Sequence, residues 1–156
     1  MIEARGLYQV KAPVELTDGA EPVGKARLRR EGGDLVIVTW GTMVQSALLA
    51  ADDLKTKGIE ASVLDLRWLN PLDEHSVSEA VGNAGSRVLI VHEAVRTGGF
   101  AGEITMRIRE LLLHDDLKIY RLTTPDVRMP ASPRLQAGLI PDRNSIVTAA
   151  KALLSR

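Results

Sequence analysis

The chain has 156 residues, with 20 lysines and arginines against 20 aspartates and glutamates, and it contains no cysteine. This length suits one domain of the usual size, about 100–150 residues, and the lack of cysteine excludes disulfides, thiolate zinc sites and cysteine nucleophiles. A net charge of zero supplies no overall cationic surface for nucleic acid. The N-terminal segment carries Glu3 and Arg5, unlike a signal peptide, and no run of about 18 apolar residues occurs. We therefore expect a cytoplasmic protein that binds neither membrane nor nucleic acid.

Residues 1–24 differ in composition from the rest of the chain. Pro13, Gly19, Pro22 and Gly24 interrupt them, and no apolar period lasts for a full helix. This pattern predicts a linker or arm at residues 1–24 and a folded domain at residues 25–156.

From residue 25 onward, predicted strands alternate with predicted helices. Residues 25–31 carry alternating arginines, typical of an edge strand, and the turn Gly32-Gly33-Asp34 predicts a hairpin with a buried central strand at 35–38. Further apolar runs predict strands at 61–66, 87–92 and 118–122. Helical periods predict four helices, which begin at Thr42, at Asp73 or Ser76, after Gly98-Gly99, and at Asn144.

This order of elements is typical of one fold class. Strands that alternate with helices form a mostly parallel sheet covered on both faces. The chain therefore predicts a three-layer α/β/α sandwich, with an irregular proline-rich crossing segment between Pro125 and Pro141.

One loop at the carboxyl end of a predicted strand holds a candidate small site. His92 and Glu93 lie where the strand ends, and Gly98-Gly99 precede a helix, so an imidazole, a carboxylate and backbone N–H groups could converge there. An alternative is purely structural: His92 caps the strand, Glu93 bonds loop backbone, and the glycines allow a tight turn. Short motifs of this kind do not decide between the two.

Other chemistries have no pattern to support them. The chain contains no G-x-G-x-x-G loop after a strand, no Gly-Lys-Ser/Thr tripeptide and no G-x-S-x-G elbow. Its three histidines, His75, His92 and His114, fall on different predicted elements, without the spacing of a metal site. These residue patterns therefore predict a fold, but no reaction.

Many short motifs in order do carry a resemblance to a known family. They include Glu3-Ala4-Arg5-Gly6-Leu7-Tyr8, Pro22-Val23-Gly24-Lys25-Ala26, Val63-x-Asp65-Leu66-Arg67, Pro71-Leu72-Asp73, His92-Glu93-Ala94 and Gly98-Gly99-Phe100-Ala101-x-Glu103-Ile104. In these the chain resembles the C-terminal domain of the beta subunit of thiamine-diphosphate-dependent 2-oxo acid dehydrogenases, part of the transketolase C-terminal domain group. The resemblance implies a five-stranded sheet with the first strand antiparallel to the others.

The resemblance also implies what this domain does not do alone. In such enzymes, thiamine diphosphate and Mg²⁺ lie between a pyrophosphate domain marked by Gly-Asp-Gly and a pyrimidine domain with an activating glutamate. The chain has no Gly-Asp-Gly, and Leu7-Tyr8 resembles the linker that leaves the pyrimidine domain. We therefore expect part of a longer subunit, inactive alone and without a cofactor of its own.

The resemblance implies a supporting role in a multienzyme complex. Its partners would be the alpha subunit, a second beta subunit and the dihydrolipoyl acyltransferase core, and the chain alone could form a homodimer. The residues that match the family at expected interfaces or structural positions are His92, Glu93, Gly98, Gly99, Glu103, Asp126 and Pro130. The substrate could be a branched-chain 2-oxo acid, pyruvate or acetoin.

Two alternatives remain open at this point. The chain could be the matching domain of a transketolase or deoxyxylulose-phosphate synthase, or a free-standing module that self-associates.

Overall fold

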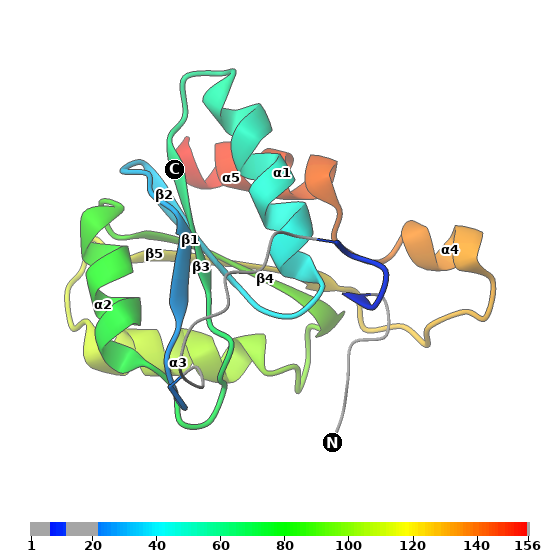
Figure 1. The fold of residues 1–156 in the computed structure, drawn as a ribbon, viewed down its shortest axis with the longest axis horizontal. Helices are drawn as coiled ribbons and strands as arrows, with labels where there is room; N and C mark the ends of the chain where they lie inside the picture. The colour runs from blue at the N-terminus through cyan, green and yellow to red at the C-terminus, as the bar shows by residue number, and fades with distance from the viewer. Residues whose placement is uncertain (1–6, 12–21, 156) are drawn as a thin grey trace.

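The computed structural model describes residues 7–11 and 22–155, so most of the predicted linker at residues 1–24 lies outside the described part. The described strands form one sheet in the order β1-β3-β2-β4-β5 (Figure 1). They are β1 (Arg27–Arg30), β2 (Leu35–Thr39), β3 (Ala61–Asp65), β4 (Arg87–Val95) and β5 (Lys118–Thr124). The helices are α1 (Met43–Lys55), α2 (Glu74–Asn83), α3 (Ala101–Leu111), α4 (Pro133–Ala137) and α5 (Arg143–Leu154).

Helices cover both faces of the sheet, which confirms the three-layer α/β/α sandwich. Figure 1 shows α1 and α5 on one face and α2 and α3 on the other. Each pair encloses its own core: Ile37 and Leu89 face α1 and α5, whereas Val38 and Ile90 face α2 and α3. Every residue of β2 and β3 is buried, because a strand covered on both faces buries its whole side-chain set and so consists mainly of aliphatic residues.

The first strand is antiparallel, as expected, but the predicted hairpin between residues 25–31 and 35–38 is wrong. β1 pairs with β3, and β2 lies between β3 and β4 in parallel register with both. The turn binds the start of β3 instead: the Asp34 N–H donates to the Glu60 carbonyl over 2.9 Å, and the Glu60 N–H donates to the Asp34 carboxylate over 2.7 Å. Both edges of β2 are therefore occupied by parallel strands, and β1 reaches the outer edge of β3.

The helix starts agree in part with the predicted caps. Asp73 caps α2 and accepts a bond from the Ser76 N–H over 3.2 Å. Thr42 precedes α1 but makes no side-chain capping bond. Asn144 does not cap α5: Asp142 does, in a reciprocal capping box with Ser145. The Asp142 carboxylate precedes the helix and accepts the Ser145 N–H, whereas Asn144 already lies inside the first turn, where a side chain cannot act as the cap.

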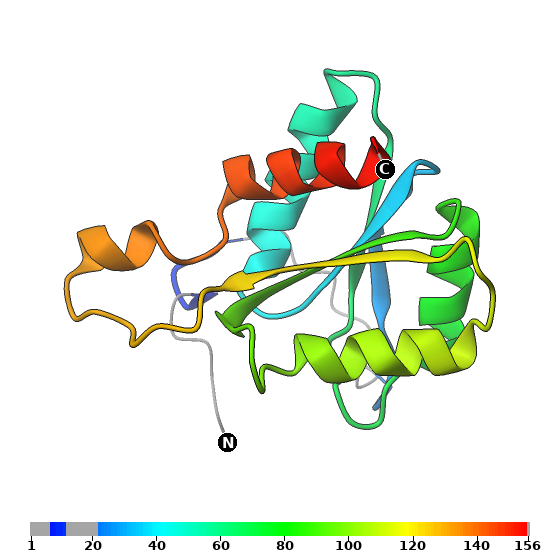
Figure 2. The same cartoon turned by 180° about the vertical axis from the view of Figure 1, so that it is seen from behind.

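The crossing segment projects from the domain. It contains the short helix α4, none of whose residues is buried, and Figures 1 and 2 show α4 standing away from the sheet. The strands β2, β3, β4 and β5 are parallel, so the loops that follow them share one edge of the sheet.

Candidate functional site

Three aromatic rings meet at the carboxyl edge of the sheet. Trp40 follows β2, His92 lies in β4, and Phe100 precedes α3. The ring centres of Trp40 and His92 are 4.3 Å apart, and those of Trp40 and Phe100 are 6.4 Å apart in an edge-to-face arrangement. This aromatic cluster brings together residues 40, 92 and 100 and packs on the core under α2 and α3.

Burial within the aromatic cluster favours the neutral form of the His92 imidazole. Burial lowers its pKa below the ordinary 6.5, and the nearby charge of Glu93 opposes this shift only in part. Its Nδ1 is buried without a hydrogen-bond partner among the described residues. Glu93 is exposed, and successive strand residues point to opposite faces, so the two side chains do not form one acid–base pair.

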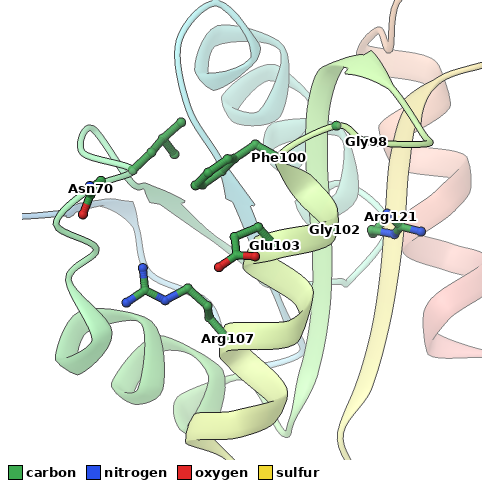
Figure 3. A pocket seen from close by; sticks show the side chains of 9 residues that line it. Asn70, Gly98, Phe100, Gly102, Glu103, Arg107 and Arg121 are labelled. Carbon is green, nitrogen blue, oxygen red and sulfur yellow. The ribbon is translucent and has the colours of Figure 1, made fainter.

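A cavity of about 610 Å³ opens beside the aromatic cluster. The β3–α2 loop, the loop before α3, α3 itself and β5 supply its lining, which consists of Leu69, Asn70, Gly98, Gly99, Phe100, Gly102, Glu103, Arg107 and Arg121. In Figure 3, Phe100, Glu103 and Arg107 extend toward the loop that carries Asn70, whereas Arg121 lies on β5 across from Gly102.

The cavity is lined by one carboxylate, Glu103, and two guanidinium groups, Arg107 and Arg121. Arg107 is engaged in an ion pair with Glu74 of α2. Glu103 has no hydrogen bond or ion pair to any residue in the described part of the chain, and its carboxylate lies in the first turn of α3, where the helix dipole favours negative charge. The lining includes no histidine, serine or lysine, and Glu103 is its one carboxylate.

The glycines before α3 are required for two different reasons. Gly98 has φ +74°, a left-handed conformation that costs other residues about 1–2 kcal/mol. A Cβ on Gly99 would lie 2.1 Å from the carbonyl oxygen of Val95. The two residues therefore shape the loop between β4 and the cavity.

Asp126 ties two loops of this edge together. It accepts the Thr97 N–H over 2.8 Å and the Thr97 hydroxyl over 2.7 Å. These bonds hold the pKa of Asp126 below its ordinary value. Pro130 serves the same segment, since its carbonyl accepts a bond from the Gln136 amide over 2.8 Å.

The predicted site residues thus fall into separate groups. Gly98, Gly99 and Glu103 line the cavity, and His92 lies beside Trp40 in the aromatic cluster. Glu93, Asp126 and Pro130 do not line the cavity, although Asp126 binds the loop beside it. Their roles at interfaces stay predictions.

Sequence reasoning missed the polar partners of the cavity. Neither Asn70 nor Arg107 is among the predicted site residues, and Arg107 gives no local signal because its partner Glu74 is 33 residues away. A basic residue four positions before the end of an amphipathic helix resembles ordinary solvated surface.

The described residues offer no metal centre and no membrane span. Within residues 7–11 and 22–155, no group of three or more His, Cys, Asp or Glu side chains could hold a metal ion. None of the helices described there is long and apolar enough to cross a bilayer.

Comparison with known proteins assigns this chain to a family. The family model of the transketolase C-terminal domain matches residues 24–146. The chain is 36% identical over 151 residues to the 2-oxoisovalerate dehydrogenase subunit beta of Bacillus subtilis, covering 96% of this chain and 46% of the relative. It is 38% identical over 151 residues to the acetoin:2,6-dichlorophenolindophenol oxidoreductase subunit beta of Cupriavidus necator, covering 96% of this chain and 44% of the relative.

A solved structure shows the same arrangement of elements. The split-gene transketolase described as an inactive beta4 tetramer has a TM-score of 0.76 and 26% identity, over 92% of this chain and 46% of its own. The chain thus spans less than half the length of each of these three proteins. A family match over most of the described residues, together with the five-stranded sheet and its antiparallel β1, shows that this chain belongs to the transketolase C-terminal domain family.

Proposed function

We propose that this chain is the C-terminal, non-catalytic assembly domain of the beta subunit of a 2-oxo acid dehydrogenase. The observation that carries the proposal is the 36–38% identity to beta subunits across 96% of the chain. The geometry is compatible with it, because the cavity at the carboxyl edge is lined by glycine-shaped backbone and by a carboxylate without a partner among the described residues. Such a surface suits contact with neighbouring domains.

The cofactor implied by the family does not fit the residues described here. A diphosphate with Mg²⁺ needs clustered oxygen ligands, and the described residues provide no such cluster. We therefore assign thiamine diphosphate and Mg²⁺ to other parts of the intact enzyme and derive no step through them.

The proposed partners follow from the similarity to beta subunits. We propose that the domain packs against an alpha subunit and a second beta subunit in the cytoplasm, and that the assembled complex meets a dihydrolipoyl acyltransferase core. A branched-chain 2-oxo acid, pyruvate or acetoin would be the substrate of the intact enzyme.

A domain exchange tests this function. The corresponding C-terminal domain of the Bacillus subtilis 2-oxoisovalerate dehydrogenase subunit beta is replaced by this chain, and the chimera is co-expressed with its alpha subunit. We expect co-elution of both subunits and 2-oxo acid decarboxylation. A chimera that is folded by circular dichroism but does not bind the alpha subunit would contradict the proposal. So would micromolar binding of thiamine diphosphate with Mg²⁺ by this chain alone, measured by isothermal titration.

A second candidate is the C-terminal domain of a split transketolase, favoured by the TM-score of 0.76 to that structure. The same exchange into the beta chain of the split transketolase, assayed for ketol transfer between sugar phosphates, discriminates between the two. Activity there and none in the dehydrogenase chimera would favour this alternative.

A further inference from the structure

A groove lies between the edge strand β1 and α2, at the edge of the sheet opposite β5. Its main part encloses about 330 Å³, and a smaller hollow of about 100 Å³ shares Leu28, Glu79, Ala80 and Asn83 with it. We name the two together the β1–α2 groove. None of its lining residues lines the cavity at the carboxyl edge, so it is a separate hollow, of the size that small ligands occupy, about 300–1,000 Å³.

The floor of the groove is apolar. Leu28 of β1 pairs with Leu64 of β3, and both line the groove together with Ala80 of α2. Leu64 and Ala80 belong to the core under α2 and α3, whereas Leu28 remains 46% exposed. An aliphatic chain in the groove would therefore cover apolar surface that the domain itself leaves open to water.

The charged groups around this floor are all acidic. Glu31 follows β1 and Glu79 lies on α2; both are exposed, and neither has a hydrogen bond or ion pair with any residue that the structure describes. No lysine or arginine lines the groove, and Arg30, the neighbour of Glu31 in sequence, is paired with Asp52 of α1 instead. The charge of both carboxylates is therefore uncompensated within the described part of the chain.

The end of α2 adds to this negative potential. Glu79 and Asn83 lie about one turn apart, and α2 ends at Asn83 without a basic residue in its last turn. The carbonyl groups at a helix C-terminus carry partial negative charge and so favour a cation. The turn between β1 and β2 reaches this end, since a Cβ on Gly33 would lie 3.9 Å from the Asn83 carbonyl oxygen. Helix end and carboxylates thus favour the same kind of ligand.

A buried hydroxyl completes the polar lining. Ser62 is only 4% exposed and donates its proton to the Leu35 carbonyl over 3.3 Å, so its oxygen keeps lone pairs that accept from no described residue. The Asn83 amide has no partner in the described part of the chain either. Gly32 fixes this wall closely against β3, because a Cβ there would lie 2.4 Å from the Ala61 carbonyl carbon. The groove is therefore a preformed set of acceptors around an apolar floor.

We propose that the β1–α2 groove binds an aliphatic diamine as its dication, with one ammonium group at Glu31, the other at Glu79, and the methylene chain over Leu28. An ammonium group donates three hydrogen bonds and accepts none, which suits carboxylate, hydroxyl and amide oxygens that lack donors. Long aliphatic amines place their methylene groups on apolar surface and keep their charged ends at polar groups. The site goes beyond the assembly role proposed above and does not rest on it.

Titration of the isotope-labelled chain with diaminobutane, followed through the amide NMR signals, tests this site. At about pH 7 both amino groups are charged, and we expect saturable shifts at Glu31, Ser62, Glu79 and Asn83. Butanediol has the same chain length without charge and should cause no saturable shift. Butylamine has one ammonium group and should bind about fivefold more weakly than diaminobutane.

Two variants with a matched control assign the charges. Glu31→Gln and Glu79→Gln each remove one carboxylate charge and keep the size of the side chain, and each should weaken diaminobutane binding about fivefold. Glu110→Gln makes the same change at an exposed position of α3, outside the groove, and should leave the affinity unchanged. Circular dichroism confirms that all three variants are folded.

Three results would overturn the proposal. Shifts that do not saturate, or that spread equally over exposed carboxylates elsewhere, would show unspecific attraction of a cation. Butanediol that binds as well as diaminobutane would show that charge plays no part. An affinity that neither Glu31→Gln nor Glu79→Gln lowers would place the diamine outside the groove. None of these results bears on the domain exchange, so this proposal and the proposed function fail independently.

Discussion

The adjacent glycines before α3 provide a sharp test of the loop geometry, because each is required for a different physical reason. Gly98 has φ +74°, but an added Cβ would meet nothing within 4 Å. Gly99 would instead bring a Cβ to 2.1 Å from the Val95 carbonyl oxygen. Substitution at Gly98 therefore tests backbone conformation, and substitution at Gly99 tests space.

The expected magnitudes differ accordingly. Gly98→Ala forces a left-handed alanine, at a cost of about 1–2 kcal/mol, and Gly98→Asn should cost less because asparagine tolerates that region. Gly99→Ala requires the Val95 carbonyl to retreat from 2.1 Å to at least 3.0 Å. Because this shift moves backbone at the end of β4, Gly99→Ala should lower the free energy of unfolding by an amount at or above the upper end of the roughly 1–3 kcal/mol range for overpacking. Gly99→Asn should be no more stable than Gly99→Ala.

Urea denaturation followed by circular dichroism measures these free energies of unfolding. Midpoints should fall in the order wild type, Gly98→Asn, Gly98→Ala, Gly99→Ala, with unchanged m-values. In thermal scans, each kcal/mol should appear as about 2–4 °C for a chain of this size. A Gly99→Ala protein as stable as wild type, or more stable than Gly98→Ala, would refute this account of the loop.

Three further predictions concern single side chains. Asp142→Ala should cost about 1 kcal/mol of unfolding free energy through the lost cap of α5, and Asn144→Ala clearly less; equal urea midpoints would contradict the assigned cap. The His92 ring should titrate below its ordinary pKa in an NMR experiment, and Trp40→Ala should raise that pKa by admitting water, so an unchanged titration would argue against burial by Trp40. Because the pKa of Asp126 is lowered in the folded protein, ionised Asp126 stabilises the fold. This contribution to the free energy of unfolding is complete above the ordinary aspartate pKa of about 3.9 and is lost as the pH falls through the lowered pKa. The Tm of the wild type should then fall further on acidification than the Tm of Asp126→Asn. Parallel curves of Tm against pH would argue against stabilisation by the Asp126–Thr97 hydrogen bonds.

Much of the sandwich could be predicted because its signals are local. The aliphatic run Leu35–Val38 and its counterpart at residues 88–91 identify strands buried on both faces. The spacing of Ile104 and Ile108 identifies the buried stripe of α3. Each of these patterns lies within one element and repeats with the period of that element.

The partner of an edge strand was not predictable in the same way. Arg27 and Arg29 indicate an exposed edge, but they do not say which strand lies beside it. The turn at Gly32-Gly33-Asp34 suggested the neighbour in sequence, whereas β3 takes that place. A tight turn favours a hairpin only when the edge of the next strand is free, and here both edges of β2 are occupied.

The site shows the same division. The fold class, the carboxyl edge of the sheet and the family motifs were predictable, since all of these reside in short contiguous patterns. Three contacts of the site were not predictable: Trp40 covers His92, Arg107 pairs with Glu74, and Asp126 accepts hydrogen bonds from Thr97, 29 residues away. These contacts join segments far apart in the chain, and the packing of helices on a shared sheet, which no local period encodes, brings them within reach.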